Sequence, residues 1–187
     1  MGSRKQELTD QLIAYLVAHG PTDLALRPMA AATGTSARLL IFHFHSKEEL
    51  LATVLEGLQA RVKESLERLL ESPRPEPAPL LRQFWDWALA ADNLGLLRLL
   101  YQLHMLATQG PEPSARYLKQ NALNWLEWIQ AALPAALRDP ATATLFGAVF
   151  DGLFIEFLSS GDRDRTTAAL ERFITMARQP APPRSPR

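Results

Sequence analysis

The chain has no cysteine, which excludes disulfides, thiolate nucleophiles and cysteine-ligated zinc. It has no net charge, because 20 basic side chains balance 20 acidic ones. No uninterrupted apolar run reaches the roughly 18 residues of a membrane span, and the first residues lack the apolar core of a signal peptide. We therefore expect a cytoplasmic protein with no membrane partner, no metal and no cofactor.

The balanced total hides a mild asymmetry along the chain. The first 47 residues carry five basic and three acidic side chains, a net charge of +2, and the remainder carries a net charge of −2. A basic N-terminal part permits nucleic-acid binding there. With 187 residues, 47% of them hydrophobic, the chain is long enough for one or two small domains with buried cores.

Apolar residues recur at helical spacing, and proline and glycine fall mostly between these segments, which predicts an all-α fold of about nine helices. Helices are expected at about 5–19, 28–33, 37–43, 46–70, 78–91, 94–108, 114–137, 141–159 and 163–178. Asp92-Asn93 is expected to separate two of them. The proline-rich tail, 180–187, is expected to be disordered.

Local sequence signals mark where the first four helices begin and end. Gly20 is suited to end the first helix, and Gly34 to make a tight turn between the second and third. Ser36 is a cap for the third helix, and Ser46 with Glu49 forms a capping box that opens the fourth. Small residues at 30–32 would let short helices pack closely, which predicts an N-terminal helix-turn-helix. We expect a DNA-binding domain over 1–47 and a larger helical ligand-binding and dimerisation domain over 48–179.

Residues between about Arg4 and Leu55 are similar to the TetR/AcrR family of transcriptional regulators. The matching motifs are Leu26-Arg27-Pro28-Met29-Ala30, Thr33-Gly34-Thr35-Ser36, His43-Phe44 and Ser46-Lys47-Glu48-Glu49-Leu50-Leu51. This resemblance implies DNA contacts by Thr35, Ser36, Ala37, Arg38 and Leu39 at the start of a recognition helix, by His43 and Lys47 on phosphates, and by Arg4 and Lys5 on backbone or minor groove.

The recognition helix departs from the family pattern. Ile41 stands where the family usually has tyrosine, and the helix is unusually apolar. Arg38 is the residue there that can read guanine bidentately, whereas Leu39, Ile41 or Phe42 could contact thymine methyl groups. Part of the recognition could also be through DNA shape.

Aromatic and apolar residues gather in the second half of the chain. As the resemblance implies an effector site there, the candidate ligand-binding residues are Phe84, Trp85, Tyr101, His104, Met105, Trp125, Trp128 and Phe150, with plain core packing as the alternative for each. The resemblance also implies a four-helix dimer interface, with candidates Phe146, Val149, Leu153, Phe157, Leu170, Phe173, Ile174 and Ala177. Gly147 and Gly152 could allow close helix approach across it.

The function expected from these features is a homodimeric one-component repressor, released from a palindromic double-stranded operator by a small, largely apolar effector. The alternative is a dimeric helical ligand-binding or protein-interaction module with weakened DNA binding, which the apolar recognition helix favours. An enzyme is not expected, because the sequence has no phosphate-binding loop, no His-Glu-x-x-His motif and no cysteine. His43 and His45 are a weak metal pair, because no acidic cluster accompanies them.

Overall fold

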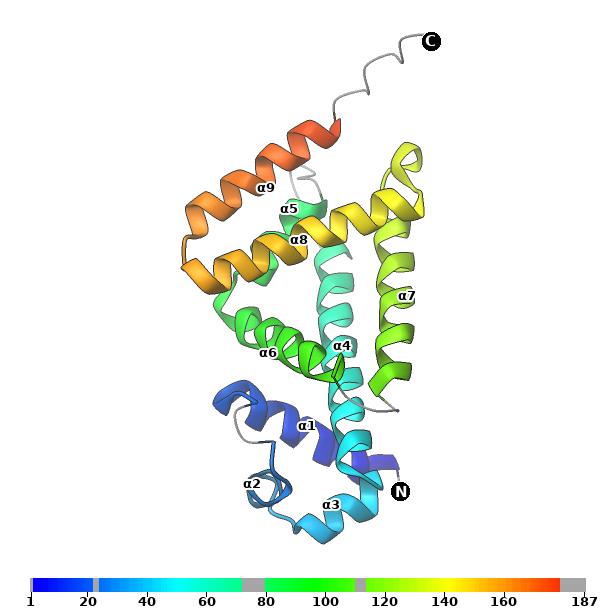
Figure 1. Cartoon of the computed structure of the whole chain (residues 1–187), viewed down its shortest axis with the longest axis vertical. Helices are drawn as coiled ribbons and strands as arrows, with labels where there is room; N and C mark the ends of the chain where they lie inside the picture. The colour runs from blue at the N-terminus through cyan, green and yellow to red at the C-terminus, as the bar shows by residue number, and fades with distance from the viewer. Residues whose placement is uncertain (1, 22–23, 72–79, 110–113, 179–187) are drawn as a thin grey trace. The chain divides into compact units, whose positions relative to one another are not determined.

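The computed structural model describes residues 2–21, 24–71, 80–109 and 114–178, and the regular structure of this part is entirely helical (Figure 1). The helices are α1 (Gly2–His19), α2 (Leu26–Ala32), α3 (Ala37–Phe44), α4 (Lys47–Glu71), α5 (Leu80–Ala88), α6 (Ala91–Ala107), α7 (Ser114–Ala132), the short 3-10 helix η1 (Ala135–Leu137), α8 (Pro140–Ser160) and α9 (Arg163–Arg178). The expected all-α fold is confirmed.

The chain forms two compact units. The first comprises residues 1–73 and 88–124, and the second comprises residues 74–87 and 125–187. These two units are defined by packing contacts. The boundary expected after Lys47 is a functional one, between a DNA-binding domain and a ligand-binding and dimerisation domain, and it stays a prediction. The tail expected to be disordered, 180–187, lies outside the described residues.

In the first unit, α4 is the helix around which the others pack. It contacts α1, α3 and α6. Its buried stripe at helical spacing consists of Leu50, Val54, Leu55, Leu58, Val62 and Leu66, and α1 contributes Leu8, Leu12, Ile13 and Leu16. At Gly57 the two helices approach so closely that an added Cβ would lie 2.9 Å from the Cδ1 atom of Ile13.

The turn between α2 and α3 has the expected chemistry. Gly34 adopts φ +60°, which glycine tolerates without a Cβ clash. The amide of Thr35 donates to the carbonyl of Ala30 at 2.9 Å, and the amide of Leu39 donates to Ser36 Oγ at 3.2 Å. The second and third helices are thus joined by a hydrogen-bonded turn, as in a helix-turn-helix.

A strained turn joins α3 to α4. His45 has φ 68° and ψ −45°, and the amide of Ser46 donates to the carbonyl of Phe44 at 2.8 Å across it. This is the rare γ-turn with positive φ, an unfavourable conformation for a residue with a Cβ. The Ser46 hydroxyl then accepts from the amide of Glu49 at 3.0 Å and caps α4, as the sequence predicts.

In the second unit, α5 packs with α8 and α9. Trp85 is fully buried, and its indole N–H donates to Thr167 Oγ1 at 2.8 Å. Arg82 pairs with Asp86 on its own helix and with Glu171 on α9. The contact between α5 and α9 therefore combines a buried indole, whose N–H is hydrogen-bonded, with an ion pair between the two helices. These polar contacts fix how the two helices pack.

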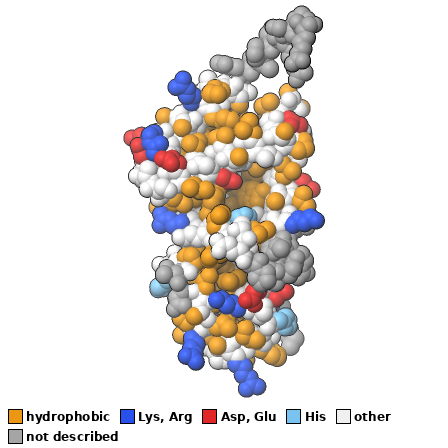
Figure 2. All heavy atoms as spheres, viewed as in Figure 1, with side chains coloured by type: hydrophobic (Ala, Val, Ile, Leu, Met, Phe, Trp, Pro, Cys, Tyr) orange, Lys and Arg blue, Asp and Glu red, His pale blue; other side chains and the backbone are white. Residues whose placement is uncertain are grey.

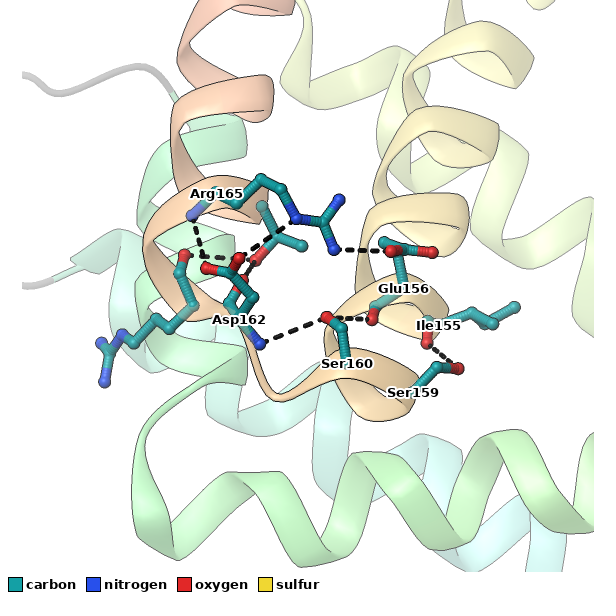
Figure 3. Close-up of polar contacts among 8 residues, drawn as sticks. Ile155, Glu156, Ser159, Ser160, Asp162 and Arg165 are labelled. Atoms are coloured by element: carbon teal, nitrogen blue, oxygen red, sulfur yellow. Dashed lines mark hydrogen bonds and ion pairs between the residues drawn. The ribbon is translucent and has the colours of Figure 1, made fainter.

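The turn between α8 and α9 is held by a polar network (Figure 3). Gly161 has φ 70°, and Asp162 caps α9 by accepting from the amide of Arg165 at 3.0 Å. The Arg165 guanidinium pairs with Glu156 at 2.6 Å and with Asp162 at 3.2 Å. These hydrogen bonds, the backbone one first, lower the pKa of Asp162.

Two expected helix limits are wrong. Asp92 and Asn93 do not separate helices, because α6 begins at Ala91 and the break lies at Ala90, where the backbone is extended. The helix expected to reach Leu137 ends at Ala132, because Pro134 follows and cannot donate a helical hydrogen bond. Residues 135–137 then form η1.

Candidate nucleic-acid interface and ligand-binding region

Helix α3 is anchored on one face and open on the other. Leu40 and Phe44 are fully buried and fix the helix to the first unit. On the opposite side Leu39 is 49% exposed and Phe42 is 62% exposed, and Arg38 is also exposed. The helix expected from sequence to be the recognition helix therefore exposes side chains at the surface rather than lying inside the protein.

The beginning of α3 also lies at the surface. Ser36 is exposed, although its hydroxyl is engaged as the cap, and Thr35 and Ala37 are partly exposed. These positions, with Arg38 and Leu39, form the end of the helix that the family resemblance assigns to base contacts. The structure brings all five together at one helix start.

The sequence that forms α2, α3 and the turns around them carries basic but no acidic side chains. No acidic residue occurs between Asp23 and Glu48, whereas Arg27, Arg38 and Lys47 lie in this stretch. Figure 2 shows Lys and Arg side chains beside hydrophobic ones in the lower part of the view, where α2 and α3 lie. A positive rim around an exposed helix is complementary to a phosphate backbone.

The other predicted phosphate contacts have different surroundings. His43 is half-buried and lies edge-on to Phe42 at 5.3 Å between ring centroids, and Lys47 is the first residue of α4. Arg4 and Lys5 belong to α1, which starts earlier than expected: Arg4 pairs with Glu7 at 3.0 Å, and the Lys5 ammonium lies 5.3 Å from the ring centroid of Phe44. Lys5 therefore places its charge next to the end of α3.

An aromatic cluster fills part of the second unit. Phe84 stacks on Phe150 with ring centroids 4.1 Å apart and planes inclined by 8°, and it lies 6.5 Å from Trp125. Trp128 meets Trp125 edge-on at 5.7 Å. Phe84, Trp125 and Trp128 are partly exposed, so the cluster of these four residues combines a packed base with an accessible edge.

The remaining candidate ligand residues lie elsewhere. Trp85 is fully buried and its single donor is used, which is the pattern of a core residue. Tyr101, His104 and Met105 lie on α6, in the first unit, where Met105 is 58% exposed. None of the eight belongs to the polar cleft that α1 and α4 form around Asp10 and Arg61.

Comparison with family models gives no match, and comparison with curated proteins gives none either. Solved structures do match over nearly the full chain. A candidate transcriptional regulator from Pseudomonas aeruginosa PAO1 superposes with a TM-score of 0.73 at 20% identity, covering 94% of this chain and 90% of that one. A candidate TetR-family transcriptional regulator from Rhodococcus sp. gives 0.67 at 18% identity, with 91% and 98% covered. This chain has the TetR-family fold.

A third match was solved with bound ligands. The multidrug binding protein EbrR, solved with imidazole, superposes with a TM-score of 0.67 at 26% identity, covering 98% of this chain and 93% of that one. The same protein was also solved with ethidium and with proflavin. The TetR resemblance read from the N-terminal motifs thus extends to the whole fold.

On this TetR-family fold, α8 carries an uncovered apolar stripe. Leu145, Ala148, Gly152 and Ile155 lie on one face, all exposed, with Leu145 at 54% and Ile155 at 50%. Within the described part of the chain, α8 is also the one helix long and apolar enough to cross a membrane, judged by length and composition alone. Asp151 and Glu156 interrupt its apolar sequence, so the helix contains no uninterrupted apolar run of membrane-spanning length.

The predicted interface residues flank this stripe. Phe146, Val149, Leu153, Phe157, Phe173 and Ala177 are partly exposed, whereas Leu170 is fully buried and Ile174 is 5% exposed within one chain. Gly147 makes its close approach to Ile129 of the same chain, while a Cβ at Gly152 would meet no atom of the described residues within 4 Å. The sequence reasoning missed Leu145 and Ile155, although their spacing of ten residues on one helix places them on the same face.

Two further polar residues were missed on α7. Within the described part of the chain, the Tyr117 hydroxyl and Asn121 Oδ1 have no hydrogen-bond partner, although these side chains are only 6% and 7% exposed. Burial, reinforced by the negative charge of Glu56, raises the pKa of Tyr117. The spacing of four residues within a helical pattern could have indicated that both face the same way.

Proposed function

We propose that this protein is a DNA-binding transcriptional regulator that acts as a homodimer and responds to a small organic effector. The observation that carries the proposal is α3: a capped helix, anchored by Leu40 and Phe44, that exposes Arg38 on its other face and has the Lys5 ammonium next to its end. Such a helix fits the major groove, which is about 12 Å wide. The TetR-family fold supports the same function.

The homodimer is proposed from the apolar stripe on α8. An exposed row of Leu145, Ala148, Gly152 and Ile155 favours a second copy of the chain as its cover, with α9 completing a four-helix contact. Two copies related by a two-fold axis would present two recognition helices to a palindromic operator. Covering the stripe in this way is consistent with a cytoplasmic protein.

The effector is proposed to bind the aromatic cluster formed by Phe84, Trp125, Trp128 and Phe150. Stacked ring faces favour a flat, largely apolar molecule, and they also attract positive charge through the ring quadrupole. Ethidium and proflavin, which bind EbrR, are flat aromatic cations. Effector binding would release DNA only if the effector has different affinities for the DNA-bound and free conformations.

DNA binding is tested by selecting bound duplexes from a random pool and by gel shift on the region upstream of the gene. We expect a palindromic sequence to be enriched, and affinity to fall steeply with salt because phosphate contacts release counterions. Arg38→Ala should weaken binding, whereas Arg98→Ala removes the same charge from the exposed side of α6 and should not. Equal affinity for both variants, or binding insensitive to salt, would contradict the proposal.

Effector binding is tested by titrating the protein with proflavin in the absence of DNA. All four tryptophans lie in the second unit, so quenching of tryptophan fluorescence reports on the region of the cluster. Trp125→Ala and Trp128→Ala should reduce proflavin affinity, whereas Leu106→Ala, which truncates an exposed apolar side chain on α6, serves as the matched control. Equal affinity in all three variants would place the effector elsewhere.

A second candidate function is a dimeric ligand-binding or protein-interaction module without specific DNA binding. The apolar side chains of Leu39 and Phe42 favour it, because an exposed apolar pair also suits a protein partner. Failure to enrich any sequence from the random pool, together with proflavin binding, would support this candidate over the regulator.

A further inference from the structure

The exposed face of α3 is apolar at its centre. Leu39 and Phe42 are three residues apart on a helix, so their side chains lie on the same side. They are among the large hydrophobic side chains most exposed in the described part of the chain. Neither is needed for the core, because Leu40 and Phe44 anchor the helix from the other face.

The surroundings of this apolar pair indicate what covers it. Arg38 is exposed beside Leu39, the ring of His43 lies edge-on to Phe42, and α2 and α3 contain no acidic residue. A protein partner would need an acidic surface around an apolar spot. The major groove of DNA offers both features together, because phosphates line its rims and the C5-methyl group of thymine is the apolar group on its floor.

We infer that Leu39 and Phe42 read thymine methyl groups, so that each operator half-site contains thymines at positions set by these two side chains. This inference rests on the proposed DNA-binding function and specifies how it selects sequence. Arg38, one residue before Leu39, is the side chain suited to guanine O6 and N7. The half-site is therefore expected to contain a guanine close to methyl-bearing pyrimidines.

The specificity of this readout differs from a hydrogen-bonded one. Phe42 and Leu39 have no polar atom in their side chains, so they cannot distinguish donors from acceptors on base edges. They can distinguish thymine from cytosine only through the methyl group. Because 5-methylcytosine carries a methyl group at the same ring position, it should substitute for thymine in this contact more readily than cytosine does.

The test uses the duplex enriched from the random pool, with each thymine replaced in turn by deoxyuridine. This replacement removes the methyl group and leaves the base-pairing atoms unchanged. Loss of one buried methyl group is expected to weaken binding about fourfold, and loss in both half-sites roughly 15-fold. Phe42→Ala and Leu39→Ala should each abolish the deoxyuridine effect at one thymine position, whereas Arg38→Ala should leave it intact. A double-mutant cycle that combines each protein variant with each deoxyuridine replacement measures this coupling.

The outcomes separate this inference from the function on which it depends. An operator that binds equally well with deoxyuridine at every thymine position overturns the thymine-methyl readout but does not contradict the proposed DNA-binding function. A deoxyuridine effect that persists unchanged in Phe42→Ala and Leu39→Ala also overturns it, because the methyl would then act through DNA shape. If no sequence is enriched, the DNA-binding function fails and the inference fails with it. If Phe42→Ala dissolves a self-associated species in the absence of DNA, a second copy of the chain covers the apolar pair, and the thymine-methyl readout is overturned.

Discussion

The turn at His45 allows a prediction in which removing a side chain stabilises the protein. His45 adopts φ 68° and ψ −45°, and its side chain is exposed. A left-handed conformation costs an ordinary residue roughly 1–2 kcal/mol, and a positive-φ γ-turn is more strained than most. Glycine avoids this cost but loses about 0.5–1 kcal/mol more backbone entropy on folding.

His45→Gly should therefore stabilise the native state by about 1 kcal/mol, which for a chain of this length raises Tm by roughly 2–4 °C. His45→Ala is the matched control, because it removes the imidazole and keeps the strained backbone. It should change the free energy of unfolding by less than about 0.5 kcal/mol, as exposed substitutions usually do. Gly161→Ala is the reverse control: φ is 70° there and a Cβ would meet no atom of the described residues within 4 Å, so the variant should lose stability through backbone strain alone.

The assay is thermal unfolding followed by circular dichroism, with urea unfolding as a second measure. A His45→Gly protein that melts at or below the temperature of the original would refute the argument, because strain at this turn would then not limit stability. A His45→Ala protein that gains as much as His45→Gly would refute it differently, by showing that the imidazole rather than the backbone is unfavourable.

Three further predictions concern the second unit. Thr167→Val removes the acceptor for the buried Trp85 N–H and should cost about 1–3 kcal/mol in urea unfolding, whereas Thr167→Ser should cost little; equal losses would assign the effect to packing. Hydrogen bonds from Thr142 lower the pKa of Asp139, and those from Arg165 lower that of Asp162, so their contribution is complete above the ordinary pKa of 3.8 and is lost as pH falls below it. Asp139→Asn combined with Asp162→Asn should flatten the fall in unfolding free energy between about pH 5 and pH 2, and an unchanged slope would contradict the caps' role. Ile155→Lys should raise the dimer dissociation constant in sedimentation experiments while Gln102→Lys on α6 does not; an unchanged dimer would mean that another surface joins the copies.

Local chemistry near the N-terminus was sufficient to predict structure there. Gly34, Ser36 and Ser46 have the conformations or capping bonds expected of them, because turns and caps depend on residues close in sequence. The break before α6 was misplaced for the opposite reason. Asp92 and Asn93 are common in turns, but in the first turn of a helix Asp92 interacts favourably with the helix dipole, so the same residue suits either structure.

Candidate residues were harder to predict than elements, because exposure depends on tertiary packing. The pattern on α8 identified an apolar helix but not which side the rest of the unit covers, so Leu170 and Ile174 were expected at an interface although they are buried, and Leu145 and Ile155 were overlooked. The strained backbone at His45 carried only a weak sequence signal, because histidine is enriched at positive φ but most histidines adopt negative φ. The apolar character of α3, by contrast, was visible in the sequence. The structure adds that Leu39 and Phe42 are the exposed apolar residues, whereas Leu40 and Phe44 are buried.

The interleaving of the two units along the chain has a consequence for biosynthesis. The first unit needs residues 88–124 to be complete, and the second begins at residue 74 but ends only near the C-terminus. On the ribosome, α1 to α4 must therefore wait for α6 before α4 is fully covered. Helix α5 must wait for α8 and α9, whose residues Phe150, Thr167 and Glu171 contact it. A fragment that stops after the helix-turn-helix would leave the apolar side of α1 bare, so a truncated gene is expected to yield an aggregating product rather than a small independent DNA-binding module.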